Sequence, residues 1–378
     1  MGPVTAVYRT ELLYVMYDTG EAVPFLAEMA HQQRLGKDFR FIAEGSSVNS
    51  LTVANCENNP ELFKQIMARR IDAKAVGIQE TIDATKWSRE QKIGKESKQN
   101  IKAKVQAKVV LTGSASRLQK QVSGQIVGAR KLVFVDNFDY KKQAPSFKTV
   151  DYVQKHADVV MCPSAHTCSL FSRTKGIEVV GTPTLQTWIK QIEAAAKKKD
   201  EILTTLGFVE AKEKPIVAFM DAYDSNPTED STYKNIISPL FKELATLLQE
   251  KGYQVIIQPH PKISPQKVTT PELLSVCEYV IGYNSSTVFN SLALGKKAIY
   301  LIPELGEDKT FGHFSIDKGY AKAILFKDKT QVPSLLADLM QALKNEPPKD
   351  LFLLEQIPHD SIGKIAQLVE RELLTNLS

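Results

Sequence analysis

The chain is poor in the features that mark secreted, membrane-spanning and disulfide-rich proteins. Only 4 of its 378 residues are cysteines, and they are too scattered to form a disulfide framework. No apolar run approaches the ~20 residues needed to span a bilayer, and the N-terminus lacks the basic and apolar regions of a signal peptide. The sequence therefore predicts a protein of the reducing cytoplasm, for which any membrane contact would be peripheral.

A strong charge of either sign is also missing. The 48 Lys and Arg residues against 43 Asp and Glu residues give a net charge of +5. Such a mild excess fits anionic ligands or an anionic membrane surface and does not indicate a nucleic-acid-binding protein. The 43% hydrophobic and 24% charged residues are typical of a globular protein. A chain of 378 residues is long enough for two domains of ordinary size.

Two short β-branched runs are each followed by residues suited to binding phosphate. The run 255–258 predicts a strand that ends just before His260. The run 279–282 predicts a second strand, and Ser285 and Ser286 then begin a helix. A helix N-terminus offers free N–H groups and about half a positive charge. Hydroxyls and an imidazole at the carboxyl ends of parallel strands predict an anion site. Taken singly, the serines also fit an ordinary helix cap, and His260 fits a strand-end residue bonded to backbone.

The order of these residues resembles a known enzyme superfamily. His-Pro, then Ser-Ser before a helix, then a Gly-Lys turn is similar to the GT-B glycosyltransferase relatives that use cytidine nucleotides. These are the bacterial sialyltransferases, the capsule Kdo transferases and the CDP-glycerol glycerophosphotransferases of teichoic acid. The segment 283–290, Tyr-Asn-Ser-Ser-Thr-Val-Phe-Asn, looks most like the last of these. The resemblance implies an α/β fold of two doubly wound Rossmann-like domains facing a crevice.

The order of expected elements fits this architecture. We expect an acceptor-side domain over residues 1–206, onto which a C-terminal helix at 360–378 packs back. A nucleotide-donor-binding domain would cover residues 207–359. The segments 157–180 and 277–299 also echo each other, since each reads as a strand, a serine-containing turn, a helix, a glycine and a strand.

Polar residues follow the first expected strand as well. Residues 11–17 predict a buried strand, and a glycine-containing loop then leads to a helix with Pro24 in its first turn. Asp18 is a candidate base, although a turn or cap role fits it too. Gly20 and Glu21 in this loop are candidates for the acceptor side.

Asp136 is a second candidate base, at the end of an expected strand over 132–135. The sialyltransferase-like families carry an acidic pair and then a glycine here, and the acid acts as general base. Asn137 and Phe138 stand at the next two positions of this chain, so the match is partial and a capping role stays open.

A cluster of Cys162, His166 and Cys168 invites comparison with a metal site. A structural zinc site needs four ligands, usually with closely paired cysteines, and the sequence lacks both features here. We therefore expect no metal. His166, near the start of a helix, is a candidate for contacting an acceptor, with a structural role as the alternative.

The most basic part of the chain runs from Lys86 to Lys108. It holds eight basic and two acidic residues, a local charge of +6 that exceeds the net charge of the whole chain. A solvated helix face or loop would explain it. The functional alternative is peripheral docking to an anionic membrane or to a phosphate-bearing acceptor.

The resemblance implies a metal-independent transferase without a cofactor. It would move a sugar or glycerophosphate unit from a CMP- or CDP-activated donor, with UDP as a further option, to a hydroxyl of a cell-surface glycan or lipid. The residues expected to bind the donor are His260, Lys262, Ser285, Ser286, Thr287 and Glu304. His260 would stabilise the leaving nucleotide, and Asp136 or Asp18 would deprotonate the acceptor.

Two other functions stay open. A UDP-GlcNAc 2-epimerase-like isomerase would have the same fold, but Asn290 stands where that family carries a glutamate. A nucleotide-sugar-binding protein without catalysis would explain the incomplete acidic motif that begins at Asp136.

Overall fold

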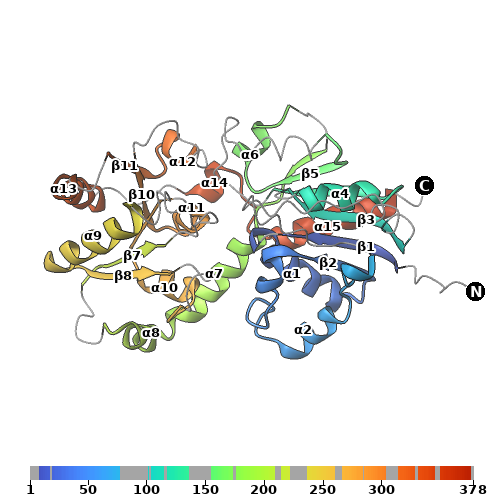
Figure 1. Ribbon diagram of the computed structural model, residues 1–378, viewed down its shortest axis with the longest axis horizontal. Coiled ribbons are helices and arrows are strands. Elements are labelled where there is room, and N and C mark those ends of the chain that lie inside the picture. Colours follow the sequence, from blue (N-terminus) through green and yellow to red (C-terminus); the bar gives the residue numbers. More distant parts are fainter. Residues whose placement is uncertain are drawn as a thin grey trace, which may run out of the picture. The chain divides into compact units, whose positions relative to one another are not determined.

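The chain forms two compact α/β units in the computed structural model (Figure 1). Unit 1 comprises Met1–Phe138, Pro145–Gln186 and Glu355–Ser378, and unit 2 is built chiefly from Thr187–Leu354. The structure describes residues 8–17, 19–76, 101, 104–114, 117–135, 155–172, 176–208, 214–221, 236–259, 266–283, 285–303, 314–327, 331–344 and 350–375.

Unit 1 contains a six-stranded sheet in which every pairing is parallel. Its strands are β1 (Tyr8–Met16), β2 (Phe39–Ala43), β3 (Val105–Gly113), β4 (Arg130–Phe134), β5 (Val159–Cys162) and β6 (Ile177–Val179), in the order β2-β1-β3-β4-β5-β6. The chain thus goes from β1 to β2 on one side and returns to β3 on the other. This reversal makes the β1/β3 edge a topological switch point, where open α/β sheets bind ligands.

Helices cover both faces of this sheet. They are α1 (Thr19–Arg34), α2 (Pro60–Met67), α4 (Arg117–Gln125), α6 (Ala165–Ser169) and α15 (Ser361–Thr375), with 3-10 turns η1 (Gly45–Ser50) and η2 (Lys74–Val76). Leu12, Tyr14 and Met16 of β1 face a core shared with α1 and α15. Leu13 and Val15 face the opposite core, which contains Val122 of α4. A parallel sheet buried on both faces reads as a continuous apolar run, which is why β1 is recognisable in the sequence.

Unit 2 contains a five-stranded parallel sheet with the same kind of reversal. Its strands are β7 (Ile216–Met220), β8 (Gln254–Gln258), β9 (Tyr279–Gly282), β10 (Lys297–Pro303) and β11 (Lys322–Phe326), in the order β11-β10-β9-β7-β8. Since β8 and β9 lie on opposite sides of β7, the switch point of this unit is at the β7/β9 edge.

The helices of unit 2 bury the apolar faces of its sheet. They are α8 (Lys199–Leu206), α9 (Ser238–Glu250), α10 (Thr270–Val276), α11 (Ser286–Ala293), α12 (Phe314–Asp317), α13 (Val332–Leu343) and α14 (Leu351–Leu354). One core joins β7 to α9 and α13, and within it the rings of Phe219 and Phe241 are 5.0 Å apart. α7 (Pro183–Ala196) begins in unit 1 and continues into unit 2.

The predicted class, two doubly wound α/β domains, is confirmed. The predicted echo is also present, as β5-α6-β6 in unit 1 and β9-α11-β10 in unit 2. The helices of the two segments begin at serine N-caps, Ser164 and Ser285. Gly176 and Gly295 precede the second strand of each segment with left-handed φ values of 66° and 77°.

The first helix of the chain differs from the expectation. The sequence indicates a loop over Gly20 and Glu21 and places Pro24 in the first helical turn, but α1 already begins at Thr19. Pro24 therefore lies inside the helix. The early start has a local cause, because the Glu21 carboxylate accepts a hydrogen bond from the Tyr17 backbone N–H and holds the end of β1 against the helix.

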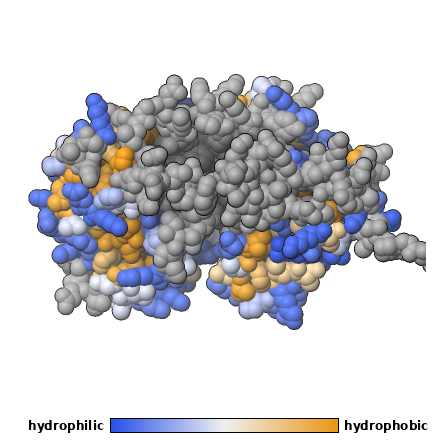
Figure 2. Space-filling view, in the orientation of Figure 1, coloured by the Kyte–Doolittle hydropathy of each residue, from blue (hydrophilic) through white to orange (hydrophobic). Residues whose placement is uncertain are grey.

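On the face shown in Figure 2, apolar patches lie beside polar residues in the described parts of each unit. Among the described residues, the exposed large apolar side chains are those of Leu35, Val127, Leu325, Leu353, Leu354 and Leu374, and of these Leu353 and Leu354 are adjacent in the sequence. Single exposed apolar residues are normal for globular proteins. Within the described ranges, no helix combines the length and the apolar character needed to cross a bilayer.

Candidate functional site

The start of α11 lies at the switch point of unit 2, directly after β9. Ser285 is the N-cap: its backbone is extended, and its side chain accepts a hydrogen bond of 3.3 Å from the Thr287 N–H. Ser286 is exposed, and neither its hydroxyl nor its N–H has a partner among the described residues. Both groups are therefore available to an anion at the positive end of the helix. The predicted place of these serines, at a helix start after a strand, is confirmed.

Gly282 sets how closely α11 approaches the sheet. A Cβ atom at this position would lie 2.5 Å from Cγ2 of Val288, well inside contact distance. Val288 and Phe289 are buried against the sheet on the inner side of α11. The glycine thus lets the helix begin immediately beside the end of β9, which fixes where the Ser286 hydroxyl lies.

Gln258, the last residue of β8, adds a buried amide near the same edge of the sheet. Its Nε2 donates to the Val268 carbonyl at 2.8 Å, and its buried Oε1 has no partner among the residues that the structure describes. Its own carbonyl accepts from the N–H of Asp221, which directly follows β7. Buried polar atoms nearly always form hydrogen bonds, so the Oε1 atom of Gln258 could accept one from a bound ligand. The sequence shows Gln258 only as a strand residue and carries no signal for this role.

Five predicted site residues lie outside the described residues. They are His260, Lys262 and Glu304 on the donor side, and the candidate bases Asp18 and Asp136. Their roles stay predictions.

Glu21 lies at the switch point of unit 1 and is fully buried. Its carboxylate accepts from the Tyr17 N–H at 3.2 Å and from Nε2 of Gln119 on α4. A Cβ atom on Gly113, at the end of β3, would lie 2.0 Å from this carboxyl group. Gly113 therefore leaves the space that the carboxylate occupies. The acceptor role of Glu21 stays a prediction, and its carboxylate points into the protein, whereas Gly20 is exposed.

Ser114 extends this polar cluster at the end of β3. Its hydroxyl is buried and has no partner in the described part of the chain. The neighbouring Thr112 hydroxyl donates to the Val15 carbonyl at 3.2 Å, and Nε2 of Gln119 approaches the same carbonyl at 3.3 Å. Gln119 is separated from Glu21 by 98 positions, so no local pattern in the sequence could have linked them.

The start of α6, which corresponds to that of α11, is already occupied by the protein. The Ala165 N–H donates to the Glu355 carbonyl at 2.8 Å, and the His166 N–H donates to the Glu355 carboxylate at 3.0 Å. Glu355 is 5% exposed, so its charge is withdrawn from water and held at the helix N-terminus. The half-buried His166 lies in this helix, and its acceptor role stays a prediction.

Metal ligands do not gather around the cysteine pair. Among the described residues, His, Cys, Asp and Glu side chains form no group of three that could hold a metal ion. His166 thus does not join Cys162 and Cys168 in a ligand set, and the expectation of a metal-free protein stays a prediction.

The end of the basic run belongs to the first sheet. β3 begins at Val105, and Nζ of Lys108 pairs with the Glu11 carboxylate at 2.8 Å. Nζ of Lys104 donates to the Ala75 carbonyl at 3.1 Å. The rest of the Lys86–Lys108 run lies outside the described residues, apart from Ile101, and membrane or acceptor docking stays a prediction.

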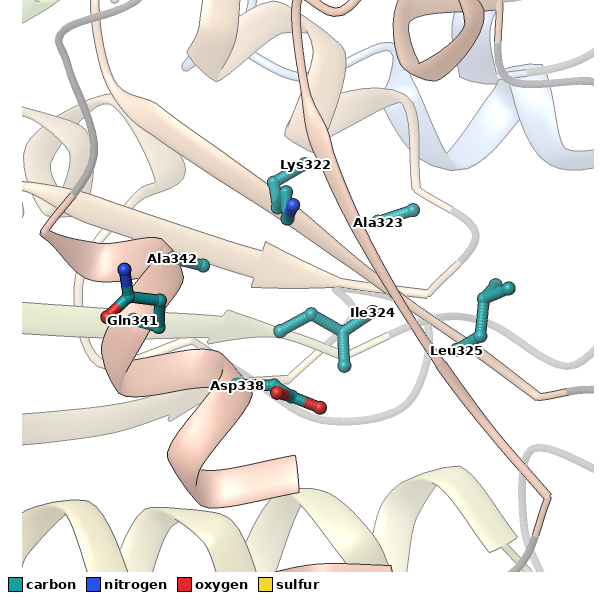
Figure 3. A pocket seen from close by; sticks show the side chains of 7 residues that line it. All are labelled: Lys322, Ala323, Ile324, Leu325, Asp338, Gln341 and Ala342. Atoms are coloured by element: carbon teal, nitrogen blue, oxygen red, sulfur yellow. The ribbon is translucent and has the colours of Figure 1, made fainter. Parts of the chain in front are cut away.

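An open hollow of about 420 Å³ lies between β11 and α13 (Figure 3). Lys322, Asp338 and Gln341 surround it, and Ile324 and Ala342 contribute apolar surface. No predicted site residue lines this hollow. It lies along the edge strand of the unit 2 sheet, whereas the start of α11 lies at the switch point, so the hollow is not the candidate site.

No family model matches this chain, and no curated protein matches its sequence. Its similarity to known proteins is therefore structural.

Solved structures of two kinds of enzyme align with nearly the whole chain. The UDP-GlcNAc 2-epimerase from Neisseria meningitidis, bound to UDP-GlcNAc, is 14% identical, with 97% of this chain and 100% of that chain covered and a TM-score of 0.58. A putative UDP-N-acetylglucosamine 2-epimerase from Listeria monocytogenes is 11% identical over 97% and 96% of the two chains, with a TM-score of 0.57. The wall teichoic acid polymerase TagF is 11% identical over 98% and 91%, with a TM-score of 0.52. These neighbours are GT-B proteins, so this chain has the GT-B fold that its sequence resembles.

Proposed function

We propose that this protein is a nucleotide-dependent transferase of the GT-B kind. It would move a sugar or glycerophosphate unit from a CMP- or CDP-activated donor, or from a UDP-activated one, to a hydroxyl of a cell-surface glycan or lipid. The observation that carries this proposal is that the N–H and hydroxyl of Ser286, at the unit 2 switch point, have no partner among the described residues.

The contrast between the two echoing segments supports an anion at this place. At the start of α6, the His166 N–H donates to the buried carboxylate of Glu355, and an anion at the start of α11 would accept from N–H groups in a similar way. The start of α11 is also capped by a serine, but within the described ranges the N–H and hydroxyl of Ser286 have no partner. Nucleotide phosphates are anions that accept hydrogen bonds from backbone N–H groups and hydroxyls at helix N-termini.

The proposed chemistry needs no metal or other cofactor from the protein. The donor phosphates would accept from Ser286, Thr287 and the first turn of α11, with further charge from His260 and Lys262. These groups would stabilise the negative charge that grows on the leaving nucleotide. Glu304 would accept from ribose hydroxyls, and Asp136 or Asp18 would take the proton from the acceptor hydroxyl.

A 2-epimerase-like isomerase is the second candidate. The epimerase neighbours have TM-scores of 0.57 and 0.58, against 0.52 for TagF. The fold therefore supports an epimerase at least as well as a transferase. Asn290, which stands at the position of that family's glutamate, is 8% exposed, and its Oδ1 has no partner. An amide cannot serve as the acid or base at that position, which favours the transferase.

Product analysis separates these functions. The purified protein is incubated with CDP-glycerol, a CMP-sugar and UDP-GlcNAc, and the nucleotides and sugars are resolved by chromatography. A transferase or a slow hydrolase releases CMP or UDP, depending on the donor, whereas an epimerase converts the UDP-sugar without release. Binding without either change would identify a nucleotide-sugar-binding protein and contradict the proposal.

The Ser286→Ala variant tests the phosphate contact. Hydrogen bonds to charged groups contribute about 1.5–3 kcal/mol, so the variant should bind CDP or UDP about tenfold or more weakly in calorimetric titration. Ser286 is exposed, and the free energy of unfolding should change by no more than about 0.5 kcal/mol.

The Ser334→Ala variant is the matched control. Ser334 is an exposed serine in the first turn of α13, and its hydroxyl donates to the Gln331 carbonyl. This variant should keep the nucleotide affinity of the wild type. If the wild type, Ser286→Ala and Ser334→Ala bind nucleotide with equal affinity, Ser286 does not contact the phosphate.

A further inference from the structure

β11 lies at one edge of the unit 2 sheet and pairs on one side only. All five of its residues, Lys322–Phe326, are in register with β10. Among the described strands, none pairs with its other side. Alternate N–H and C=O groups of an edge strand point away from the neighbouring strand and are available to a further strand. The sheet of unit 2 can therefore be extended at β11.

The outer face of β11 is apolar. Leu325 is 56% exposed and points away from α13 in Figure 3. Ala323 lies on the same face of the strand, because side chains two positions apart share a face. Ile324 lies on the opposite face and packs into the core with α13. Proteins usually protect a free edge strand with charges, proline or a covering segment, so an exposed leucine here favours an edge that another surface covers.

The hollow of about 420 Å³ beside β11 adds two opposite charges to this edge. Lys322 lines the hollow from the start of β11, and Asp338 lines it from α13 (Figure 3). Both side chains are exposed, and within the described ranges neither forms an ion pair or a hydrogen bond. The edge thus offers one cation and one anion to whatever binds there.

We propose that β11 pairs with β11 of a second copy of this chain, antiparallel and about a two-fold axis, so that the two unit 2 sheets join into one. In such a contact the same surface is used by both copies, and every contact occurs twice. With the axis near Ile324, Leu325 of each copy lies opposite Ala323 of the other, a large side chain beside a small one. Hydrogen bonds between the two strands satisfy the outward N–H and C=O groups of both.

The two charges favour a second copy over an unrelated strand. Lys322 is on the same face of β11 as Ile324, the face that α13 covers. Antiparallel pairing brings the start of one β11 beside the end of the other, so Lys322 of each copy lies on the α13 side of its partner, where Asp338 is. The pairing thus forms two equivalent contacts between Lys322 and Asp338, whereas an unrelated peptide would have to supply both charges itself. This proposal goes beyond the nucleotide site and does not depend on it.

Sedimentation equilibrium of the full chain tests for the second copy. Between about 1 and 100 μM, the wild type should show an equilibrium between monomer and dimer. Hydrogen–deuterium exchange at the two ends of this range locates the contact, because the amides of β11 should exchange at least about tenfold more slowly where the dimer prevails. A monomer at every concentration, or a dimer in which the exchange of β11 is unchanged, would overturn the proposal.

The Leu325→Arg variant tests the apolar part of the contact. Two arginines near the axis would repel each other and lose the packing on Ala323, so the dimer should dissociate at least about tenfold more readily. The matched control is Leu374→Arg, since Leu374 is an exposed leucine of α15 in unit 1. This control should associate like the wild type. A dimer that Leu325→Arg leaves unchanged would place the contact elsewhere and contradict the proposal.

A charge exchange tests the pairing of Lys322 with Asp338. Lys322→Glu and Asp338→Lys each bring like charges together, and each should weaken the dimer about tenfold or more. The variant that carries both changes restores opposite charges and should associate as well as the wild type. This recovery separates lost contact from lost folding. Lys242→Glu, at an exposed lysine of α9, is the control and should change nothing. A double variant as weak as the single ones would overturn the charge pairing and with it the choice of a second copy.

Discussion

Glu21 and Glu28 are two of the buried acidic side chains of unit 1, and their hydrogen bonding differs. The Glu21 carboxylate has two donors, Tyr17 and Gln119. Glu28 of α1 accepts a hydrogen bond from Gln32 at 2.8 Å. Within the described ranges, its buried Oε2 and the buried hydroxyl of Tyr14 have no partner. Burial raises the pKa of Glu28 to about 7, with Gln32 opposing the rise and Asp360 adding to it.

The raised pKa of Glu28 makes the stability of unit 1 depend on pH. The folded state holds this proton more tightly than the unfolded chain, whose ordinary Glu pKa is 4.5. The contribution is complete below pH 4.5 and is lost as the pH rises through about 7. The Glu28→Gln variant stays neutral and should gain stability over the wild type at pH 8.5, on the order of 2–3 kcal/mol, but little at pH 4.5.

Denaturant unfolding at the two pH values measures this effect. The Glu61→Gln variant is the control, because Glu61 is an exposed glutamate of α2 with only a weak contact to Gln65. A gain for Glu28→Gln that is the same at both pH values would rule out titration of Glu28 in this range.

At the level of residues, the sequence predicted one class of site residue and missed another. Ser285 and Ser286 were recognisable because helix caps follow a strand in a readable pattern. Glu355 and Gln119 were not recognisable as site residues, because their contacts link distant parts of the sequence. Glu355 contacts His166 across 189 positions, and Gln119 contacts Glu21 across 98. Acidic residues are mostly exposed, so no pattern indicated that Glu28 is buried.

At the level of elements, strands with continuous apolar runs were well predicted. The expected strands 279–282, 255–258 and 132–135 correspond to β9, β8 and β4 within a few residues. β11 and α4 were not predicted. β11 begins with Lys322 and exposes Leu325, since it is an edge strand. α4 is short and largely polar, and Leu118 and Val122 are its apolar residues, too few to be recognised as a helical pattern.

The contact between β9 and α11 can be tested at Gly282. Alanine there would place its Cβ 2.5 Å from Cγ2 of Val288, a β-branched side chain that cannot rotate away easily. We expect the Gly282→Ala variant to lose about 1–3 kcal/mol of stability and to bind nucleotide more weakly, because α11 must shift.

The Gly124→Ala variant is a matched control for this change. Gly124 is an exposed helical glycine of α4, and a Cβ there would contact nothing within 4 Å. This variant should be as stable as the wild type or gain up to about 1 kcal/mol from helix propensity. Unchanged stability and affinity in Gly282→Ala would show that α11 has room to move.

An ion-pair network holds α15 to the sheet of unit 1. Glu372 of α15 is 3% exposed and accepts from Nε of Arg130 at 2.8 Å and from Nε of Arg371 at 3.1 Å. Arg130 also donates to Asp158 at 2.8 Å. Removing one partner of a buried pair strands the other charge, so Arg130→Met should cost about 3 kcal/mol in chemical denaturation.

Two further variants decide how that loss arises. Arg130→Met combined with Glu372→Leu should recover much of the stability, because no unpaired buried charge remains. Arg34→Met breaks an exposed pair with Glu57 and should cost less than about 1 kcal/mol. A small effect for Arg130→Met alone would mean that Arg371 is sufficient to neutralise Glu372.

At the scale of the whole molecule, two sheets with the same reversal place polar residues at each switch point. The overall architecture was predictable because the apolar runs, the echo of 157–180 in 277–299 and the serine motif all indicated one fold. The substrate was not predictable from the sequence. Substrate identity is read by side chains on loops, which vary most among proteins that share a fold. The structural neighbours are 11–14% identical to this chain and include a polymerase and epimerases, so the substrate must be identified by experiment.

The central claim is that the start of α11 binds the phosphate of a nucleotide. Its most direct test is a crystal of the protein soaked with CDP and, separately, with UDP. The account predicts phosphate density about 3 Å from the backbone N–H and the hydroxyl of Ser286. Nucleotide bound elsewhere, with the start of α11 left empty at saturating concentration, would contradict it.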